Sequence, residues 1–446
     1  MNYIKPRLAR GMRDFFPEEI TVRREIVKKF IDIFEKYGFS PIETPALEHM
    51  EILTGKYGEE ERLIYRMEKR SDKKSAEDLG LRYDLTVPLA RVIAMNPGIV
   101  FPFKRYQIQP CWRAERPQKG RFREFIQCDI DIIGSDSVMA DCEIISVIND
   151  SLSSIDFNNF YIMINHRKIL KGIADVAGIS KERFTGLCTS IDKYDKIGFD
   201  GVEQELTKRN FLKEQSEKVL DIIKIEGNNK EKLELLQNLF KDSEDGTFGL
   251  EQTKTLFNYL ENYGVPAGRL EFNLTLSRGL DYYTGSIFEA VVKEPKIGSI
   301  AGGGRYDNLV GNFSKREVPA TGTSLGLERI FEVKFGEKLS ELKGNAKIDV
   351  IVLNFTEGLI PKALELLGFL RSERLSADIY YNSKKKIGAQ LSFAEKKDIP
   401  WAVILGPDEI KENKIVLKNL DKRDQKIVTI KDLIPYLKKM IRDDDR

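Results

Sequence analysis

Apolar and polar residues alternate along two neighbouring stretches of the chain, residues 103–113 and 121–134. In the first stretch the apolar positions are Tyr106, Ile108 and Trp112, and the polar ones are Arg105, Gln107, Gln109 and Arg113. In the second the apolar positions are Phe122, Ile126, Cys128, Ile130 and Ile132, and the polar ones are Arg123, Gln127, Asp129 and Asp131. A period of two is typical of a strand with one apolar and one polar face. We therefore predict two strands joined by a charged loop, residues 114–120.

The loop sets which residues face each other in this hairpin. If Arg113 lies opposite Arg121, then Gln107 faces Gln127 and Arg105 faces Asp129, and a slip by one residue would mix the two faces. The polar front then carries Arg113, Gln127 and Asp131. Burying such a front requires a ligand that satisfies its guanidinium, amide and carboxylate groups. The alternative is the solvated face of an ordinary antiparallel sheet.

The residues of this hairpin resemble a known motif. Arg113 ends the first strand, the loop contains ERPQKGR, and the return strand contains FREFIQCDIDIIG. This arrangement resembles motif 2 of the class II aminoacyl-tRNA synthetases, in the form of the histidyl-tRNA synthetase family. The resemblance implies an antiparallel catalytic sheet and a contact between Arg113 and the α-phosphate of ATP.

The N-terminal region predicts a helix followed by an extended segment. Pro17 and two glutamates mark a helix start, apolar residues follow at spacings of three and four, and Gly38 marks the end. Residues 38–51 resemble motif 1, which lies in the dimer interface of the family. The resemblance thus implies a homodimer, whereas the residues alone also fit a plain core helix and edge strand.

Residues 81–88, LRYDLTVP, predict a corner between a strand and a helix, with Pro88 in the first helical turn. Asp84 and Thr86 lie beside this helix start, where Asp84 suits a cation partner and either residue suits helix capping. In the resembling family, the matching residues hold the α-amino group of the amino acid.

Three later blocks complete the resemblance. Residues 278–285, RGLDYYTG, and residues 302–307, GGGRYD, resemble the histidine-specific signatures, and the three glycines allow the backbone to approach a ligand closely. Residues 318–329, VPATGTSLGLER, resemble motif 3, whose arginine, here Arg329, packs on adenine and meets the terminal phosphate. Alternating apolar residues also predict a strand over 270–276.

The pattern changes twice along the chain. Residues 168–261 are rich in Lys, Glu and Asp at helical spacing, which predicts a mostly helical insertion; in the family it touches the tRNA acceptor arm, although charged helix faces are usually just solvated. Residues 334–345 form a polar linker. After it, strands at 348–353, 377–381 and 401–405 alternate with helices at 359–372 and 387–397, which predicts a small α/β domain.

The predicted fold is therefore an α+β catalytic domain on an antiparallel sheet, with a helical insertion and a C-terminal α/β domain. The catalytic domain comprises residues 1–167 and 262–333, and residues 346–446 resemble the anticodon-binding domain of this synthetase group. Lys384, Lys385 and Lys386 form a basic cluster there, for which a solvated lysine run is the alternative.

The resemblance implies that the chain joins L-histidine to tRNA(His) through histidyl-adenylate, with ATP and Mg²⁺, for which no protein ligands are assignable. It implies catalytic roles for Arg113 and Arg278 and contacts of Arg121 and Arg329 with ATP. The implied histidine-binding residues are Asp84, Thr86, Gln127, Asp131, Arg278, Tyr282 and Tyr283. From their loop position, Gln118 and Lys119 are candidates for contacts with the tRNA acceptor end.

Several other functions remain to be weighed. Catalytically silent synthetase paralogues serve as regulatory subunits in histidine biosynthesis, but they lack the C-terminal domain and active-site residues that this chain keeps. A synthetase for proline, glycine or threonine conflicts with the two histidine-specific blocks. A tRNA-binding scaffold without catalysis conflicts with the retained phosphate-binding arginines.

Composition narrows the class of protein. The 446 residues are 41% hydrophobic and 32% charged with a net charge of +2, as expected for a globular protein of two or three domains. No apolar run reaches the about 18 residues needed to span a membrane, and the N-terminus lacks a secretory signal. Four cysteines without CxxC spacing and only two histidines, His49 and His166, predict free thiols in a reducing cytoplasm rather than a zinc site.

Overall fold

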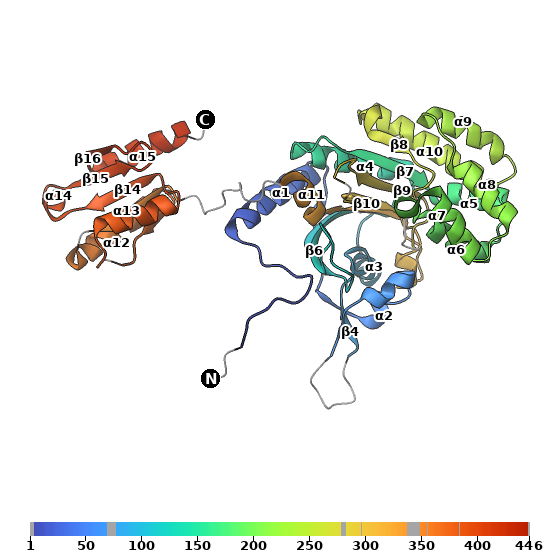
Figure 1. Cartoon of the computed structure of the whole chain (residues 1–446), viewed down its shortest axis with the longest axis horizontal. Helices are drawn as coiled ribbons and strands as arrows, with labels where there is room; N and C mark the ends of the chain where they lie inside the picture. Colours follow the sequence, from blue (N-terminus) through green and yellow to red (C-terminus); the bar gives the residue numbers. More distant parts are fainter. Residues whose placement is uncertain are drawn as a thin grey trace. The chain divides into compact units, whose positions relative to one another are not determined.

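The computed structural model describes residues 4–68, 77–277, 282–295, 297–336, 348–354, 356–382 and 384–444. Arg278 lies outside the described residues. The chain forms two compact units, one comprising Met1–Asp14 and Arg23–Leu339 and the other Phe15–Val22 and Ser340–Arg446 (Figure 1). Each unit contains its own sheet, so we describe them separately.

An eight-stranded sheet is the centre of the first unit. Its order is β1 (Ser40–Pro41), β5 (Phe103–Trp112), β6 (Glu124–Ile133), β11 (Ala320–Gly326), β10 (Ala301–Arg305), β9 (Ser286–Val291), β7 (Tyr161–His166) and β8 (Leu270–Phe272). The outermost pairs, β1–β5 and β7–β8, are parallel, and the pairs between them are antiparallel. The predicted antiparallel catalytic sheet is confirmed for all the central strands.

The hairpin of β5 and β6 forms as predicted, but its register is different. Arg105 lies opposite Asp131, and Arg113 pairs through its backbone with Arg123, so the predicted pairing was wrong by two residues. Alternation specifies register only to within two residues, because a shift of two keeps each side chain on its face. β6 also begins at Glu124, which leaves Phe122 in the loop rather than on the apolar face.

A second predicted strand, over residues 270–276, is shorter than expected. β8 ends at Phe272, and the Asn273 side chain then accepts hydrogen bonds from the backbone of Thr275 and Leu276. Asparagine favours such side-chain-to-backbone turns over a continued ladder. Alternate residues up to Leu276 remain buried. The alternation of apolar residues therefore predicted the buried positions correctly even beyond the end of β8.

Helices surround the large sheet, and a small sheet of β2 (Leu47–His49), β4 (Leu79–Leu81) and β3 (Arg66–Met67) lies in the same unit. The helices are α1 (Pro17–Lys36, of which the part from Arg23 onward belongs to this unit), α2 (Met50–Leu53), α3 (Thr86–Met95), α4 (Val138–Ser154), α5 (Arg167–Val176), α6 (Phe184–Ile191), α7 (Tyr194–Lys208), α8 (Lys213–Ile223), α9 (Asn229–Leu239), α10 (Glu244–Tyr263) and α11 (Leu327–Phe335). Helices α5 to α10 gather at one end of the unit (Figure 1). α10 contacts α4, α5 and β7, which joins this helical segment to the sheet.

The second unit is a five-stranded mixed sheet with helices on both faces. The strand order is β13 (Ala377–Ile379), β12 (Val350–Asn354), β14 (Trp401–Leu405), β15 (Lys414–Asn419) and β16 (Gln425–Thr429). α12 (Ile360–Ser372) and α15 (Ile430–Asp444) share one core, α13 (Ile387–Lys396) contributes to the other, and α14 (Pro407–Lys411) is short. The predicted α/β domain is confirmed, although β15, β16 and α15 were not foreseen.

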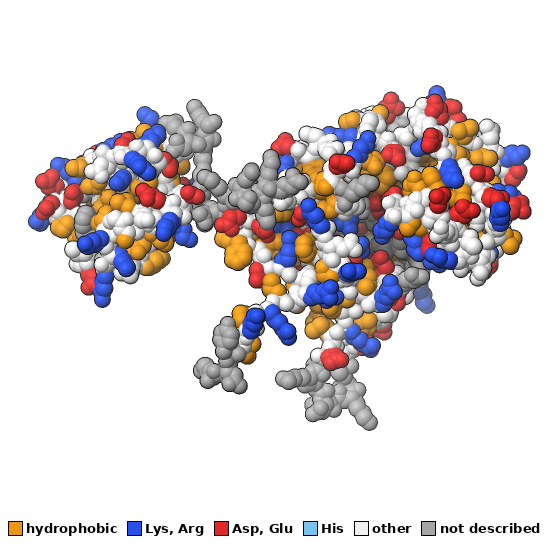
Figure 2. Space-filling model, viewed as in Figure 1, with side chains coloured by type: hydrophobic (Ala, Val, Ile, Leu, Met, Phe, Trp, Pro, Cys, Tyr) orange, Lys and Arg blue, Asp and Glu red, His pale blue; other side chains and the backbone are white. Residues whose placement is uncertain are grey.

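The surface and the cysteines agree with a globular protein. Basic and acidic side chains are intermixed across the face shown in Figure 2. None of the helices in the described ranges is long and apolar enough to cross a membrane. The four cysteines, Cys111, Cys128, Cys142 and Cys188, are buried free thiols, as predicted.

Candidate active site

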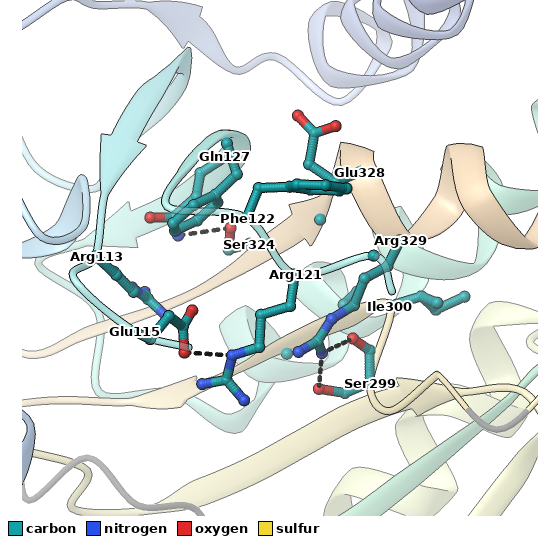
Figure 3. A pocket seen from close by; sticks show the side chains of 15 residues that line it. Arg113, Glu115, Arg121, Phe122, Gln127, Ser299, Ile300, Ser324, Glu328 and Arg329 are labelled. Carbon is teal, nitrogen blue, oxygen red and sulfur yellow. Dashed lines mark hydrogen bonds and ion pairs between the residues drawn. The ribbon is translucent and has the colours of Figure 1, made fainter. Parts of the chain in front are cut away.

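Two adjoining pockets open over the centre of the large sheet. We name the first the arginine pocket; its lining includes Arg113, Glu115, Arg121, Phe122, Phe125, Ser299, Glu328 and Arg329 (Figure 3). We name the second the carboxylate pocket; its lining includes Asp84, Thr86, Asp131, Tyr282, Tyr283, Gly303, Tyr306 and Gly322. Both pockets are lined by Arg113, Gln127, Gly302 and Ser324. A ligand spanning them would therefore contact both sets of residues.

Arg113 is held rigidly where the two pockets meet. It follows the last residue of β5, its Nε donates to the carbonyl oxygen of Tyr83 at 3.2 Å, and its guanidinium lies 4.2 Å from the centre of the Tyr83 ring. The Phe125 ring lies 5.0 Å away on the same group. Aromatic faces and a single backbone acceptor orient the planar fork but leave most of its donors for a ligand.

Arg121 lines the arginine pocket from the loop between β5 and β6, and Arg329 lines it from α11. Arg121 forms an ion pair with Glu115, and Arg329 Nη1 donates to the carbonyl oxygen of Ser299 at 2.5 Å (Figure 3). Burial and the neighbouring charges of Arg121 and Arg113 lower the pKa of Arg329. Guanidinium groups that repel one another favour an anion between them, and phosphate accepts their planar forks.

The loop between β5 and β6 ends in an exposed turn. Backbone hydrogen bonds connect Gln118 and Arg121 in both directions, and Gly120 adopts a φ of +67°, which favours glycine. Gln118 and Lys119 are exposed at this tip, and the Lys119 ammonium lies 3.4 Å from Glu332. Both residues therefore face solvent beside the arginine pocket.

Among the described residues, the lining of the carboxylate pocket includes buried acceptor atoms without a hydrogen-bond donor, and two of them lie on Asp84 and Gln127. Asp84 Oδ1 accepts from the backbone N–H of Val87 and from the Tyr57 hydroxyl, both at 3.0 Å, which fulfils the predicted helix-start role. Its other oxygen, Oδ2, is buried and has no hydrogen-bond partner among the described residues. Gln127 donates to Ser324 at 2.8 Å, and its Oε1 likewise has no partner in the described ranges. Such atoms indicate a ligand that supplies N–H donors.

Asp131 is supported by two residues whose roles the sequence did not reveal. Arg105 Nη2 lies 2.6 Å from Asp131 Oδ2, and the Tyr306 hydroxyl donates to Oδ1. Tyr306 belongs to the GGGRYD block, and this position in a signature is the feature of the sequence that could have identified it as a site residue. Arg105 carried none beyond its place on the polar face. A carboxylate oxygen has two acceptor sites, so Asp131 can still accept from a ligand.

Glycine and tyrosine residues shape the rest of the pocket. A Cβ at Gly322 would lie 1.9 Å from Asp131 Oδ1, and one at Gly303 would lie 2.0 Å from the Gly322 carbonyl oxygen. The Tyr282 ring lies 4.8 Å from that of Tyr283 and 6.0 Å from that of Tyr306. The close contact at Gly303 is with the neighbouring strand β11, so the predicted approach of the three glycines to a ligand stays a prediction. All the described residues assigned to histidine binding line this one pocket.

Three buried carboxylates gather here. Burial raises the pKa values of Asp84, Asp129 and Asp131; Arg105 opposes the shift at Asp129 and Asp131, and backbone hydrogen bonding at Val87 opposes it at Asp84. The pKa of Asp129 reaches about 7. An excess of carboxylates over nearby guanidinium groups favours a cationic ligand group such as an ammonium.

The raised pKa of Asp129 predicts a pH-dependent stability. Asp129 is protonated in the folded chain below about 7 but in the unfolded chain only below about 4. Its contribution to stability is therefore complete below pH 4 and is lost as the pH rises to 7, by up to about 4 kcal/mol. Asp129→Asn should remove this loss, and urea denaturation from pH 4 to 8 measures it. Asp136→Asn, at an exposed position, serves as the control, and parallel profiles for all three proteins would contradict the assignment.

The described residues offer no clear protein cage for a metal ion. No group of three or more His, Cys, Asp or Glu side chains among them is arranged to hold one. In the arginine pocket, Glu115 pairs with Arg121, and Glu328 pairs with Arg13 and Arg23. His166 accepts from the backbone N–H of Lys168, and burial lowers its pKa to about 3.

Comparisons with known proteins agree with this geometry. A family model described as "Histidyl-tRNA synthetase" matches residues 11–330, and one described as "Anticodon binding domain" matches residues 347–440. A Histidine–tRNA ligase from Cytophaga hutchinsonii is 40% identical, covering 97% of this chain and 99% of that protein. One from Bacteroides fragilis is also 40% identical, covering 98% of this chain and 99% of that protein.

Solved structures show the same fold. The histidyl-tRNA synthetase from Nostoc sp. PCC 7120 superposes with a TM-score of 0.81 at 32% identity, covering 98% of this chain and all of that one. A Bacillus halodurans structure titled as an ATP phosphoribosyltransferase regulatory subunit/histidyl-tRNA synthetase is 23% identical, with a TM-score of 0.70, covering 87% of this chain and 97% of that one. This likeness shows the fold alone, and the full-length relatives do not favour the regulatory alternative. The chain belongs to the histidyl-tRNA synthetase family.

Proposed function

We propose that this chain is a histidine–tRNA ligase, which forms histidyl-adenylate from L-histidine and ATP and then transfers histidine to the 3′ end of tRNA(His). The observation that carries the proposal is the pair of adjoining pockets. One offers three guanidinium groups to an anion, and the other offers buried carboxylate and amide oxygens to an ammonium. An amino acid and the triphosphate of ATP supply these complementary charges.

In the first step, the amino-acid carboxylate attacks the α-phosphorus in line, and pyrophosphate leaves. The carboxylate is ionised at pH 7, so the step needs no side-chain base. Catalysis then consists of orientation and stabilisation of the developing phosphate charge. We assign Arg113 to the α-phosphate oxygens, and Arg121 and Arg329 to the terminal phosphate. Arg278, by family resemblance, approaches the α-phosphate and the carboxylate from the other side.

Histidine would be selected in the carboxylate pocket. The ammonium binds to Asp84, Thr86 and Gln127. Among the described residues, Asp84 Oδ2 and Gln127 Oε1 have no hydrogen-bond donor, so both can accept from it. Asp131 accepts the imidazole N–H, the Tyr283 hydroxyl donates to the other ring nitrogen, and Tyr282 lines the pocket. An apolar amino acid would leave these groups unpaired, and sites of this kind discriminate by about 10⁴–10⁵ without an editing domain.

Mg²⁺ enters this scheme with ATP. The carboxylates of the arginine pocket are committed to arginines, so the described residues do not form a dedicated cage. Mg²⁺ commonly binds through substrate phosphates and water with few protein ligands. We therefore place it on the phosphates and assign no step to it.

The exposed loop tip is assigned to the second step. Gln118 and Lys119 face solvent beside the arginine pocket, where the acceptor end of tRNA must arrive. Gln118→Ala is expected to lower the rate of aminoacylation about tenfold, the scale of one lost hydrogen bond to a charged group, and to leave adenylate formation unchanged. Pyrophosphate exchange without tRNA and aminoacylation with tRNA(His), run in parallel, measure the difference. Equal loss in both assays would contradict the assignment.

The remaining predictions about organisation stay proposals. We propose a catalytic domain of residues 1–167 and 262–333, an acceptor-arm insertion of residues 168–261, a linker of residues 334–345 and an anticodon-binding domain of residues 346–446. α11 extends two residues into this linker, to Phe335. The four free thiols support a cytoplasmic location.

We also propose a homodimer formed through the motif 1 region. Leu47 in β2 and Met67 in β3 flank β4 in the small sheet and are 42% and 47% exposed. Apolar side chains exposed together in this way mark protein interfaces. Sedimentation equilibrium at micromolar concentration tests the proposal, and a monomer would contradict it.

Amino-acid-dependent ATP–pyrophosphate exchange, run with each of the twenty amino acids and without tRNA, tests the function. Exchange with histidine alone supports both the adenylate chemistry and the pocket assignment. Exchange with another amino acid would retain the ATP site and overturn the roles of Asp131 and Tyr283. Folded protein that binds histidine without any exchange would instead support the regulatory-subunit alternative.

A further inference from the structure

The segment at residues 11–13 lies against the loop between β5 and β6. The Gly11 carbonyl oxygen accepts from the backbone N–H of Arg123 at 2.9 Å, and the Arg123 carbonyl oxygen accepts from the N–H of Arg113 at 2.9 Å. Gly11 has a φ of +82°, and a Cβ there would lie 2.7 Å from Pro117 Cγ and 2.9 Å from Arg123 Cγ. The N-terminal segment thus continues the backbone pairing that holds Arg113.

Arg13 joins this loop to the start of α11. Its Nη2 donates to Glu328 Oε2 at 2.7 Å, and the centre of its guanidinium lies 3.5 Å from the centre of the Phe122 ring. Phe122 belongs to the loop, and Glu328 immediately precedes Arg329 in α11. A guanidinium that pairs with a carboxylate while stacking on an aromatic face fixes both groups at once.

Glu328 is a buried junction for three parts of the unit. Arg23 of α1 donates to both of its oxygens at 2.6 Å, and Oε1 also accepts from the backbone N–H of Ile126 in β6 at 3.2 Å. Its side chain is only 5% exposed. Glu328 and Arg329 point in different directions from the start of α11 (Figure 3). The Glu328 contacts therefore fix the helix start that aims Arg329 into the arginine pocket.

We propose that Arg13 is a positioning residue for ATP, which holds the β5–β6 loop and the start of α11 in the binding geometry before the nucleotide arrives. This inference rests on the proposed function of the arginine pocket. Phe122 and Glu328 line that pocket, so Arg13 acts through them. Without its cation, the aromatic ring loses one fixed neighbour and the carboxylate loses one of its two guanidinium partners. The loop then has more conformations to lose when ATP binds, which lowers affinity.

Arg13→Gln tests the proposal, with Arg10→Gln as the matched control at an exposed position of the same segment. In pyrophosphate exchange, Arg13→Gln should raise the KM for ATP about tenfold, as expected when supporting contacts no longer orient a site. The KM for histidine should stay within about twofold, because the carboxylate pocket keeps its contacts. Arg13→Lys keeps the charge but not the planar stacking, so its KM for ATP should lie between those of Arg13→Gln and Arg10→Gln.

Limited trypsin digestion supplies a readout independent of activity, because the loop contains Lys119 and Arg121, neither of which precedes a proline. Cleavage in this loop should be faster in Arg13→Gln than in Arg10→Gln, and ATP should slow it. If Arg13→Gln does not fold, Gly11→Ala provides the second variant, since its Cβ would push the segment away from Pro117 without removing a charge. It should change the KM for ATP and the cleavage rate in the same direction.

The outcomes separate this inference from the proposed function. If the folded variants show an unchanged KM for ATP and unchanged loop cleavage, the positioning role of Arg13 is overturned. The proposed function is unaffected as long as the wild type shows histidine-dependent pyrophosphate exchange. A raised KM for ATP without faster cleavage would make Arg13 a direct ATP contact and would also overturn it. If the wild type shows no pyrophosphate exchange with any amino acid but Arg13→Gln still speeds loop cleavage, the proposed function is overturned. The role of Arg13 in holding the loop is then retained.

Discussion

Arg113→Ala is expected to lower the rate of histidine-dependent pyrophosphate exchange about 10³-fold, the scale seen when a donor to a developing oxyanion is removed. The structure leaves most of the Arg113 donors available to a ligand where the two pockets meet. No other guanidinium among the described residues lines both pockets. The loss should appear mainly in kcat, because the charge on the α-phosphate develops most strongly in the transition state.

Two companion variants sharpen this test. Arg113→Lys keeps the charge but not the bidentate fork, so it should recover only part of the rate. Arg116→Ala, at an exposed position in the same loop, should exchange like the wild type in the absence of tRNA. Circular dichroism establishes that each variant folds. Near-normal exchange by folded Arg113→Ala would remove Arg113 from the proposed role.

The second large effect is expected at Asp84. Asp84→Asn retains an oxygen for the Val87 N–H and the Tyr57 hydroxyl but removes the charge beside the buried Oδ2. An ammonium arriving there would meet a neutral amide, whose N–H donors oppose it. Loss of one partner of a buried charge pair typically costs about 3 kcal/mol, which is about 100-fold in kcat/KM for histidine.

The control for this variant is Asp78→Asn, since Asp78 pairs with Arg66 on the surface. The KM for ATP should be nearly unchanged in Asp84→Asn, because Asp84 does not line the arginine pocket. Histidine binding measured by calorimetry should fall together with kcat/KM. Unchanged histidine affinity would show that the ammonium binds elsewhere and would leave Asp84 with its helix-start role alone.

The sequence predicted the elements that depend on local patterns. Alternation placed β5 on the predicted residues, helical spacing and Pro17 placed α1, and period changes separated the C-terminal α/β domain. The motif residues were found because their types and order along the chain resemble those of a known family. Such features are properties of short segments and need no knowledge of what packs against them.

The register of the hairpin and the partners of its polar face depend on contacts between distant segments. The sequence allowed Arg105 to face Asp129, whereas the fold pairs Arg105 with Asp131 and brings Tyr306, which directly follows β10 and is 175 residues away in the chain, to the same carboxylate. Alternation cannot distinguish registers that differ by two. The structure distinguishes them, because Arg105 Nη2 lies 2.6 Å from Asp131 Oδ2.

What the sequence by itself determined is therefore the family and the order of its main elements, while the residues that carry the chemistry stay predictions. Only the tertiary structure decided how those residues are held: which oxygen of Asp84 remains without a donor, and how Arg13 reaches Glu328 across 315 residues. These hydrogen bonds and ion pairs form between segments that meet only in the folded chain. Their specificity comes from three-dimensional packing rather than from spacing along the chain.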